Sequence, residues 1–466
     1  MTALETWELR AEFARRLSAM YGREVPAYNT LVEVSTEVNE AYVAKHGAEA
    51  ERLGSIARVT AERHGAIRVG SPKEMAQVAR IFAAFGMYPV GFYDLRDASS
   101  SSVPVVSTAF RPIDGAELAK NPFRVFTSML AAEDPRFFDR ELRAELAEFI
   151  GARQLFGEEL LNLADRAAAN GGLHADDADR LLELATAAFE LSGDPVDYEW
   201  YKKLEAVSAV ASDIGGVSTT HINHLTPRVL DIDELYKRMK ARGISMIDEI
   251  QGPPRWDGPD LLLRQTSFRA LGENRVFRYA DGSTSEGELR VRFGEVEARG
   301  IALTVAGRDL YDRMVAESDA RLALAPAGTT RVEVAAEVWA ECLPRTEKEL
   351  ALQGLAFFTY RLDEDALDST SLAGTATLAD LIEAGIAVPE PIVYEDFLPR
   401  SAAGIFQSNL TEEGSKDEAQ TGTSYDIHRM SRIVGSEVHD PNDLYQRQQD
   451  ESIAALAHRL NITVTH

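Results

Sequence analysis

The stretch GGVSTTHINHLTPRVLDID, residues 215–233, holds the densest group of potential metal ligands in the chain. His221 and His224 lie three residues apart in it, after a Gly-Gly pair and before a Thr-Pro pair, and the chain has only nine histidines. Neutral imidazole suits borderline metals such as iron, zinc and manganese, and two imidazoles with one carboxylate leave coordination positions open. The stretch therefore predicts a metal site whose remaining ligands come from elsewhere in the chain.

The segments around this stretch alternate between strand and helix patterns. HINHLTPRVL and LLLRQTSFRAL are extended patterns, DIDELYKRMKARG between them is typical of a capped helix, and ELRVRFGEVEARGIALT is again extended. An earlier region has the same order: the strand GAIRV, the helix SPKEMAQVARIFAAFG with Ser71 as its cap and Pro72 in its first turn, and the strands YPVGFYDL and VPVVSTAFRPI. Two βαβββ-like units predict an α+β fold in which paired modules form a β barrel.

The rest of the chain is more helical. Residues 133–212 are dense in Ala, Leu and Glu and contain no clear strand pattern, so we expect several helices there. The C-terminal third mixes helix and strand patterns and ends in a helix. The predicted organisation is N-terminal helices at 1–60, a first module at 61–130, an α-helical insertion at 131–212, a second module at 213–330 and a C-terminal α/β extension at 331–466.

Composition excludes several classes of function. The 466 residues carry a formal net charge of -26, which repels nucleic acid and anionic membrane surfaces. No apolar run reaches the roughly 18 residues of a membrane span, and the start of the chain has no signal-peptide pattern. The one cysteine, Cys342, excludes an internal disulfide and suits a reducing cytoplasm; in the helical pattern EVAAEVWAEC we expect it to be buried and inert. The oligomeric state stays open.

The strand RHGAIRVG offers both a ligand and a substrate-binding group. Alternation places His64, Ala66 and Arg68 on one face, with roughly 13 Å between the first and last of them. A metal on His64 would leave room for a short diacid whose far carboxylate meets the Arg68 guanidinium. The alternative is structural: His64 would cap a turn, and Arg68 would make a surface ion pair.

Two residues are candidates for the carboxylate ligand, and two residues are candidates for the second histidine ligand. In RVRFGEVEARG, Glu295 and Glu297 share a face of the expected strand, and the pattern does not separate them. A solvated acidic strand face is the alternative for both. His221 and His224 are an odd number of residues apart, so they should face opposite sides of a strand. We therefore expect only one of them to be a ligand and the other to donate a hydrogen bond or cap the turn.

Four motifs together resemble one enzyme family. RHGAIR at 63–68, HINHLTPRVLDID at 221–233, FGEVEARGIALT at 293–304 and YEDFLPRSAAGIFQSNL at 394–410 are similar, in this order, to the 2-oxoadipate dioxygenase/decarboxylase family, also called hydroxyglutarate synthase. That family belongs to the vicinal oxygen chelate superfamily. The resemblance implies an Fe(II) enzyme of lysine catabolism that converts 2-oxoadipate and O2 to 2-hydroxyglutarate and CO2.

The resemblance also implies roles for particular residues. The iron ligands, which are also the catalytic centre, fall on His64, His224 and Glu295. Arg68 matches the binder of the substrate carboxylate. The turn at Arg400 and Ser401 matches a segment that contacts substrate, although position 400 is often small and apolar in the family. Two other readings stay open: a non-redox zinc or manganese lyase, isomerase or hydrolase on the same fold, and a non-catalytic binding protein.

Overall fold

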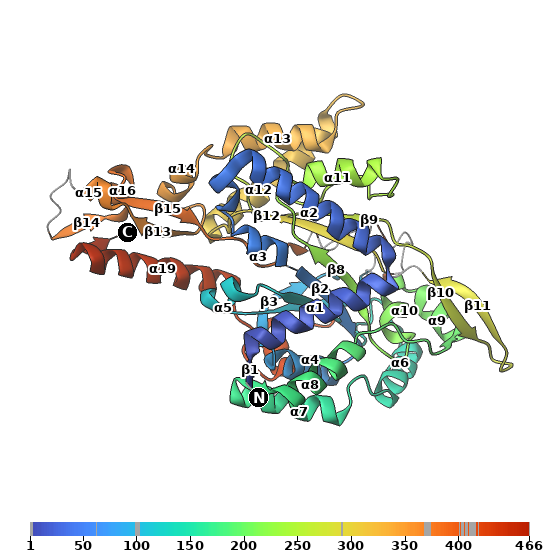
Figure 1. Ribbon diagram of the computed structural model, residues 1–466. Helices are drawn as coiled ribbons and strands as arrows, with labels where there is room; N and C mark the ends of the chain where they lie inside the picture. Colours follow the sequence, from blue (N-terminus) through green and yellow to red (C-terminus); the bar gives the residue numbers. More distant parts are fainter. Residues whose placement is uncertain are drawn as a thin grey trace.

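The computed structural model describes residues 3–61, 63–97, 103–289, 292–367, 374–399, 401, 405, 409, 416–417 and 419–465. Its centre is a five-stranded sheet in the order β3-β4-β5-β2-β8 (Figure 1). β2 runs parallel to β5 and antiparallel to β8, so β2 lies inside the sheet with a partner on each side. The strands are β2 (Arg63–Val69), β3 (Tyr88–Asp94), β4 (Val105–Arg111), β5 (Arg124–Leu130) and β8 (Ile222–Pro227).

The first module begins with the predicted strand, helix and two further strands, and continues with a short helix and a strand for which no pattern was identified. After β2, the side chain of Ser71 accepts a hydrogen bond from the backbone N–H of Glu74, and Pro72 occupies the first turn of α4 (Pro72–Ala83). The chain turns after α4 at Gly86, whose φ of +63° favours glycine. It then passes through β3, β4, the short α5 (Gly115–Lys120) and β5.

The second module joins the sheet at β8 but extends it differently. α11 (Ile232–Ala241) follows β8, and β9 (Leu263–Phe268) pairs antiparallel with β12 (Gly294–Arg299). A bridge between Arg228 and Glu297 brings the end of β8 beside β12. β10 (Glu273–Arg278) and β11 (Thr284–Leu289) form a hairpin that projects from one end of the molecule (Figure 1). Among the described residues these strands form separate sheets, so the fold is a mixed α/β fold and the predicted barrel is not found as one closed sheet.

The predicted helical insertion is mostly helical and packs on the first module and on the N-terminal helices. α7 packs against α4, and α8 packs against α1. Two short strands, β6 (Gly172–His174) and β7 (Val196–Asp197), were not predicted, because pairings of two or three residues are too short for alternation to show. The helices are α6 (Arg140–Ala152), α7 (Glu158–Asn170), α8 (Ala175–Ala187), α9 (Tyr198–Glu205) and α10 (Ala209–Gly215).

The N-terminal segment covers the sheet and shares its core. Leu9 and Phe13 belong to the same buried cluster as Phe82 of α4 and Ile222 of β8. One hydrophobic core therefore crosses the predicted segment boundaries. The division of the chain into domains at these boundaries stays a prediction. The elements are β1 (Ala3–Glu5), α1 (Thr6–Glu24), α2 (Pro26–His46), the 3-10 helix η1 (Gly47–Glu51) and α3 (Ile56–Ala61).

The C-terminal third mixes helices with short strand pairs, as its pattern indicates. The long helix α19 packs along β13, and β14, α15 and α16 lie at the end opposite the β10–β11 hairpin (Figure 1). The elements are α12 (Val305–Leu324), α13 (Arg331–Cys342), α14 (Glu347–Leu352), β13 (Phe358–Leu362), α15 (Glu364–Leu367), β14 (Thr375–Thr377), α16 (Leu378–Glu383), β15 (Ala387–Pro391), α18 (Ile427–Val434), α19 (Pro441–Leu460) and β16 (Thr463–Thr465).

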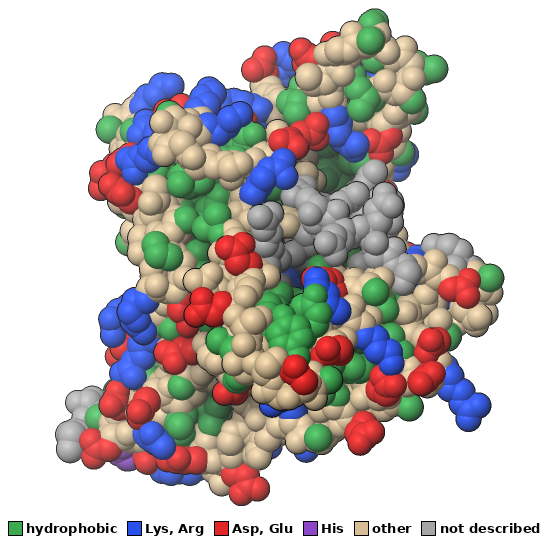
Figure 2. Space-filling model, turned by 90° about the vertical axis from the view of Figure 1, so that its right-hand side faces the viewer, with side chains coloured by type: hydrophobic (Ala, Val, Ile, Leu, Met, Phe, Trp, Pro, Cys, Tyr) green, Lys and Arg blue, Asp and Glu red, His purple; other side chains and the backbone are tan. Residues whose placement is uncertain are grey.

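The surface corrects one prediction. Cys342 is exposed rather than buried, because it is the last residue of α13 and the buried stripe of that helix ends at Trp339. Acidic and basic side chains are interspersed on the face shown in Figure 2. Among the described helices, none combines the length and the apolar character needed to cross a bilayer.

Candidate metal centre

β2 separates two cores and carries site residues on one face only. Ile67 and Val69 point into the core beneath the sheet, while Ala66 belongs to the second core on the other side. His64 and Arg68 share the face of Ala66, as alternation predicts, and both are buried. Neither residue is at the surface, so the alternative of a turn cap and a surface ion pair is wrong.

Three strands bring His64, His224 and Glu295 together. In the sheet, Ala66 pairs with His224, which places the two histidine rings 5.4 Å apart and nearly perpendicular. Nε2 of His64 lies 3.3 Å from Oε1 of Glu295, and Nε2 of His224 lies 3.5 Å from Oε2 of the same carboxylate. One ligand atom from each residue lies within 4.8 Å of the others, and all three side chains are buried. They come from β2, β8 and β12.

This cluster fits a metal ion. Ligand atoms at about 2.1 Å from a metal, and 90 to 109° apart, lie about 3.0 to 3.4 Å from one another, which is close to the observed separations. Neither ring nitrogen of His224 has a hydrogen-bond partner among the described residues, although the ring is buried. Burial lowers the pKa of His224 to about 4, so the imidazole is neutral and can offer a lone pair.

Glu297 lies behind the cluster rather than in it. One of its oxygens, Oε2, lies 2.8 Å from Nδ1 of His64, and the carboxylate accepts two hydrogen bonds of 2.8 Å from Arg299. Burial alone would raise the pKa of Glu297, but the charges of Arg299 and His64 outweigh it and lower the pKa. Such a carboxylate fixes the ring of a metal-binding histidine and leaves Nε2 for the metal. Glu295, which accepts a hydrogen bond from Gln265, faces the histidines instead.

Arg68 lies in a second polar group on the same face. Its Nη1 donates to Oδ2 of Asp213 on α10, and the same oxygen accepts a hydrogen bond of 3.0 Å from the side chain of Asn223. Nε2 of His221 lies 3.4 Å from the other oxygen of Asp213 and 3.2 Å from the Asn223 amide nitrogen. His221 therefore belongs to the surroundings of Arg68 and not to the cluster of His64, His224 and Glu295.

The parity argument for the two histidines fails at Asn223. The register of β2 and β8 shifts there, since Ala66 pairs with His224 while the next residue, Ile67, pairs with Ile222. The extra residue breaks the alternation of side chains, so an odd spacing no longer means opposite faces. The sequence pattern contains no sign of this bulge.

The YEDF sequence at 394–397 closes one side of the cluster. The ring of Phe397 meets the ring of His64 edge-on, with 5.0 Å between centroids, and lies 4.9 Å from the ring of Phe126. The guanidinium of Arg299 stacks over the ring of Phe397 and donates to the carbonyls of Tyr394 and Asp396. An aromatic wall therefore shields His64 from solvent.

Buried ion pairs hold this segment in place. Asp396 accepts hydrogen bonds of 2.8 and 2.9 Å from Arg111 of β4 and a further one from Tyr445 of α19. Glu395 accepts one of 2.6 Å from Arg124 of β5. The sequence reasoning missed all of these partners. The sequence does show two adjacent acids before an aromatic residue in YEDF, but it does not show their partners, because Arg111 and Arg124 lie more than 250 residues away and Tyr445 lies 49 residues away.

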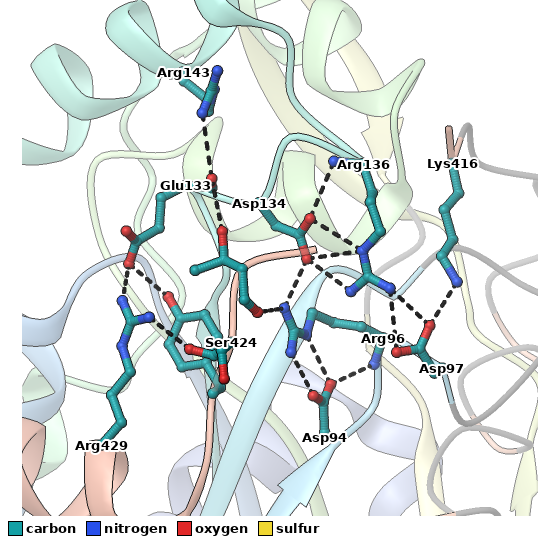
Figure 3. Close-up of polar contacts among 12 residues, drawn as sticks. Asp94, Arg96, Asp97, Glu133, Asp134, Arg136, Arg143, Lys416, Ser424 and Arg429 are labelled. Carbon is teal, nitrogen blue, oxygen red and sulfur yellow. Dashed lines mark hydrogen bonds and ion pairs between the residues drawn. The ribbon is translucent and has the colours of Figure 1, made fainter. Parts of the chain in front are cut away.

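The chain beyond this segment is docked on the loops after β3 and β5. Buried Asp134 binds both Arg96 and Arg136, and Arg96 also donates to the carbonyl of Thr423 (Figure 3). Lys416 pairs with Asp97 at 2.7 Å. Ser401, one of the predicted substrate contacts, is buried, whereas Arg400 lies outside the described residues.

The fold and the cluster define a class of protein: a mixed α/β protein with a buried group of two histidines and one carboxylate that could hold a metal ion. The chain belongs to the 2-oxoadipate dioxygenase/decarboxylase family, whose sequence model matches residues 13–409. The family resemblance of the four motifs is thereby confirmed.

Relatives with this name cover almost the whole chain. A Mycobacterium tuberculosis protein named 2-oxoadipate dioxygenase/decarboxylase is 54% identical over 448 residues, which are 96% of this chain and 98% of the relative. A Pseudomonas putida protein of the same name is 42% identical and is covered to 97%, like this chain. The crystal structure of the Pseudomonas putida hydroxyglutarate synthase in complex with 2-oxoadipate superposes with a TM-score of 0.82 at 38% identity, covering 98% of this chain and 99% of that one.

Proposed function

We propose that this protein is a 2-oxoadipate dioxygenase/decarboxylase that converts 2-oxoadipate and O2 to 2-hydroxyglutarate and CO2 as a step of lysine breakdown. The observation that carries the proposal is the meeting of His64, His224 and Glu295 on the face of the sheet that also holds Arg68. The names of the relatives, and the 2-oxoadipate in the related crystal structure, support the choice of substrate. We place the reaction in the cytoplasm, which suits a chain with one cysteine.

His64, His224 and Glu295 would hold the metal, and we propose Fe(II). Two imidazoles and one carboxylate with open positions are the usual ligand set of non-haem iron oxygenases. The bound iron would supply Lewis acidity for the 2-oxo acid group and redox chemistry for O2. Glu297, whose Oε2 lies 2.8 Å from Nδ1 of His64, would hold that side of the ring and leave Nε2 directed at the metal.

The other residues bind and shield the substrate. The guanidinium of Arg68 would bind the far carboxylate of the substrate. Arg68 is four residues along β2 from His64, a separation of roughly 13 Å along the strand. Because the long Arg68 side chain can extend toward His64, the remaining gap suits an extended six-carbon diacid. Phe397 and Phe126 exclude water from the reacting end. Ser401 and Arg400 complete the proposed substrate contacts, and the paired modules of the vicinal oxygen chelate type remain our interpretation of the fold.

The experiment that tests the proposal is oxygen uptake by anaerobically iron-loaded protein after addition of 2-oxoadipate, with 2-oxoglutarate as the shorter comparison. We expect one O2 consumed for each five-carbon hydroxy diacid detected by mass spectrometry. Absence of uptake with bound iron would refute the dioxygenase, and turnover with zinc or manganese without O2 would replace it by the non-redox alternative. His224→Ala should lose the bound metal, whereas His221→Gln should retain it.

A further inference from the structure

Arg68 does not stand alone at its end of the site. Its buried guanidinium shares Asp213 with Asn223, and His221 lies against the other oxygen of that carboxylate. Arg68 and Asp213 each expose about 3% of their side chains, so the pair is shut off from bulk water. A carboxylate in this position compensates the arginine charge and also fixes the direction of a long side chain that has many rotamers.

The element that carries Asp213 is itself held firmly. α10 ends at Gly215, whose carbonyl accepts a hydrogen bond of 2.8 Å from the indole of Trp200. A Cβ at Gly215 would come within 2.6 Å of a Leu146 side-chain carbon, and one at Gly216 within 2.5 Å of the Ser212 carbonyl oxygen. Both glycines therefore allow a close approach that larger residues would prevent. Asp213 is consequently a fixed point from which Arg68 is oriented.

Arg68 lies on the same face of β2 as the candidate metal centre. It is two residues from Ala66, which pairs with His224 in the sheet, so the arginine and the cluster line the same side of the sheet. The place of the guanidinium relative to His224 and Glu295 then decides which diacid can bridge them. Movement of the Arg68 side chain would change the length of substrate that fits.

We propose that Asp213 is a positioning residue that sets the chain-length selectivity of the site by fixing the guanidinium of Arg68. This inference rests on the proposed function, because it assumes a 2-oxo diacid with one end at the metal and the other at Arg68. Asp213 does not touch the substrate; it acts through the arginine, and it distinguishes the six-carbon diacid from the five-carbon one.

The test compares Asp213→Asn and Asp213→Glu with the wild-type protein. The Asn variant keeps the size but weakens the hold on Arg68, and the Glu variant keeps the charge but displaces the guanidinium by one methylene. Two ratios are measured: kcat/KM for 2-oxoadipate over 2-oxoglutarate, and the ratio of their dissociation constants in anaerobic calorimetric titrations. We expect both ratios to fall about tenfold or more in each variant, which corresponds to about 1.4 kcal/mol, with metal content unchanged.

Asp134→Asn is the matched control, since Asp134 is a buried acid that binds two arginines away from the cluster of His64, His224 and Glu295. It should lower the melting temperature and leave both ratios as in the wild type. Ratios within twofold of wild type in folded Asp213 variants would overturn the inference, while the proposed function would stand. A wild-type protein that binds the diacids selectively without turnover would refute the proposed function alone, because the binding ratio still tests Asp213. Failure to bind either diacid would refute both.

Discussion

Oε2 of Glu297 lies 2.8 Å from Nδ1 of His64, although the two residues are 233 positions apart in the chain and belong to different sheets. The same carboxylate accepts hydrogen bonds from Nε and Nη2 of Arg299. Arg299 and Glu297 therefore lie on the Nδ1 side of the His64 ring, and Nε2 on the other side of the ring faces Glu295 and the candidate metal position.

Glu297→Gln should weaken metal binding. The amide has the size of the carboxylate but no charge, so His64 loses the partner that fixes its ring and raises its basicity. We expect iron affinity and O2 uptake to fall by about 10- to 100-fold, measured by metal titration and an oxygen electrode. Glu286→Gln, at an exposed glutamate of β11, is the control and should behave as wild type. Unchanged metal affinity in Glu297→Gln would contradict the role of Glu297.

Much of β2 and its surroundings could be predicted from the sequence, because local rules decide them. Alternation placed His64 and Arg68 on one face, and the cap at Ser71 with Pro72 marked the start of α4. These features depend on neighbours in the chain. The same holds for the order β2, α4, β3 and β4, whereas α5 and β5 were not identified from the sequence.

The partners of the site residues could not be predicted in this way. Glu295 and Glu297 lie on the same face of their strand, and only the position of His64 distinguishes their roles: Nε2 of His64 faces Glu295 and Nδ1 faces Glu297. The bulge at Asn223 invalidated the parity argument, and the pairing of Arg68 with Asp213 spans 145 residues. Each of these facts depends on which strands and helices meet, and hydrophobic periodicity contains no information about that.

The buried neutral His221 should make the metal-free protein less stable in mild acid. Burial, with the charges of nearby arginines, outweighs the pull of Asp213 and lowers the pKa of His221 to about 4, below the value of about 6.5 in an unfolded chain. The unfolded state therefore binds a proton first, so stability is complete above about pH 6.5 and falls as the pH drops toward 4. Between pH 7 and pH 5 the loss of unfolding free energy from this one residue should be about 2 kcal/mol.

Urea unfolding at both pH values measures this loss, and the His221→Gln variant should lose correspondingly less unfolding free energy than the wild type. Equal losses in the two proteins would show that His221 is not the group responsible.

The pair of Asp396 and Arg111 should contribute strongly to stability. Asp396→Ala leaves a fully buried guanidinium without its carboxylate, which costs about 3 to 5 kcal/mol. We expect the unfolding free energy to fall by about that amount, and O2 uptake to fall as well, because Phe397 loses its support beside His64. Asp312→Ala removes an exposed ion pair with Arg308 and should cost less than about 1 kcal/mol. Similar losses in the two variants would contradict the importance of the buried pair.

Arg68→Lys tests the substrate end of the site while leaving a positive charge on β2. Lysine has no planar fork, so it cannot hold Asp213 and a substrate carboxylate with the geometry of a guanidinium. Because the ring nitrogens of His64 and His224 and the carboxylate of Glu295 are untouched, metal content should stay at the wild-type level. The dissociation constant for 2-oxoadipate in anaerobic titration should rise about 100-fold, the equivalent of about 2.7 kcal/mol.

Arg63→Lys, on the same strand but outside the cluster, is the control and should leave the dissociation constant unchanged. Loss of metal together with substrate would mean that Arg68 maintains the metal centre itself, and an unchanged dissociation constant would mean that the far carboxylate binds elsewhere.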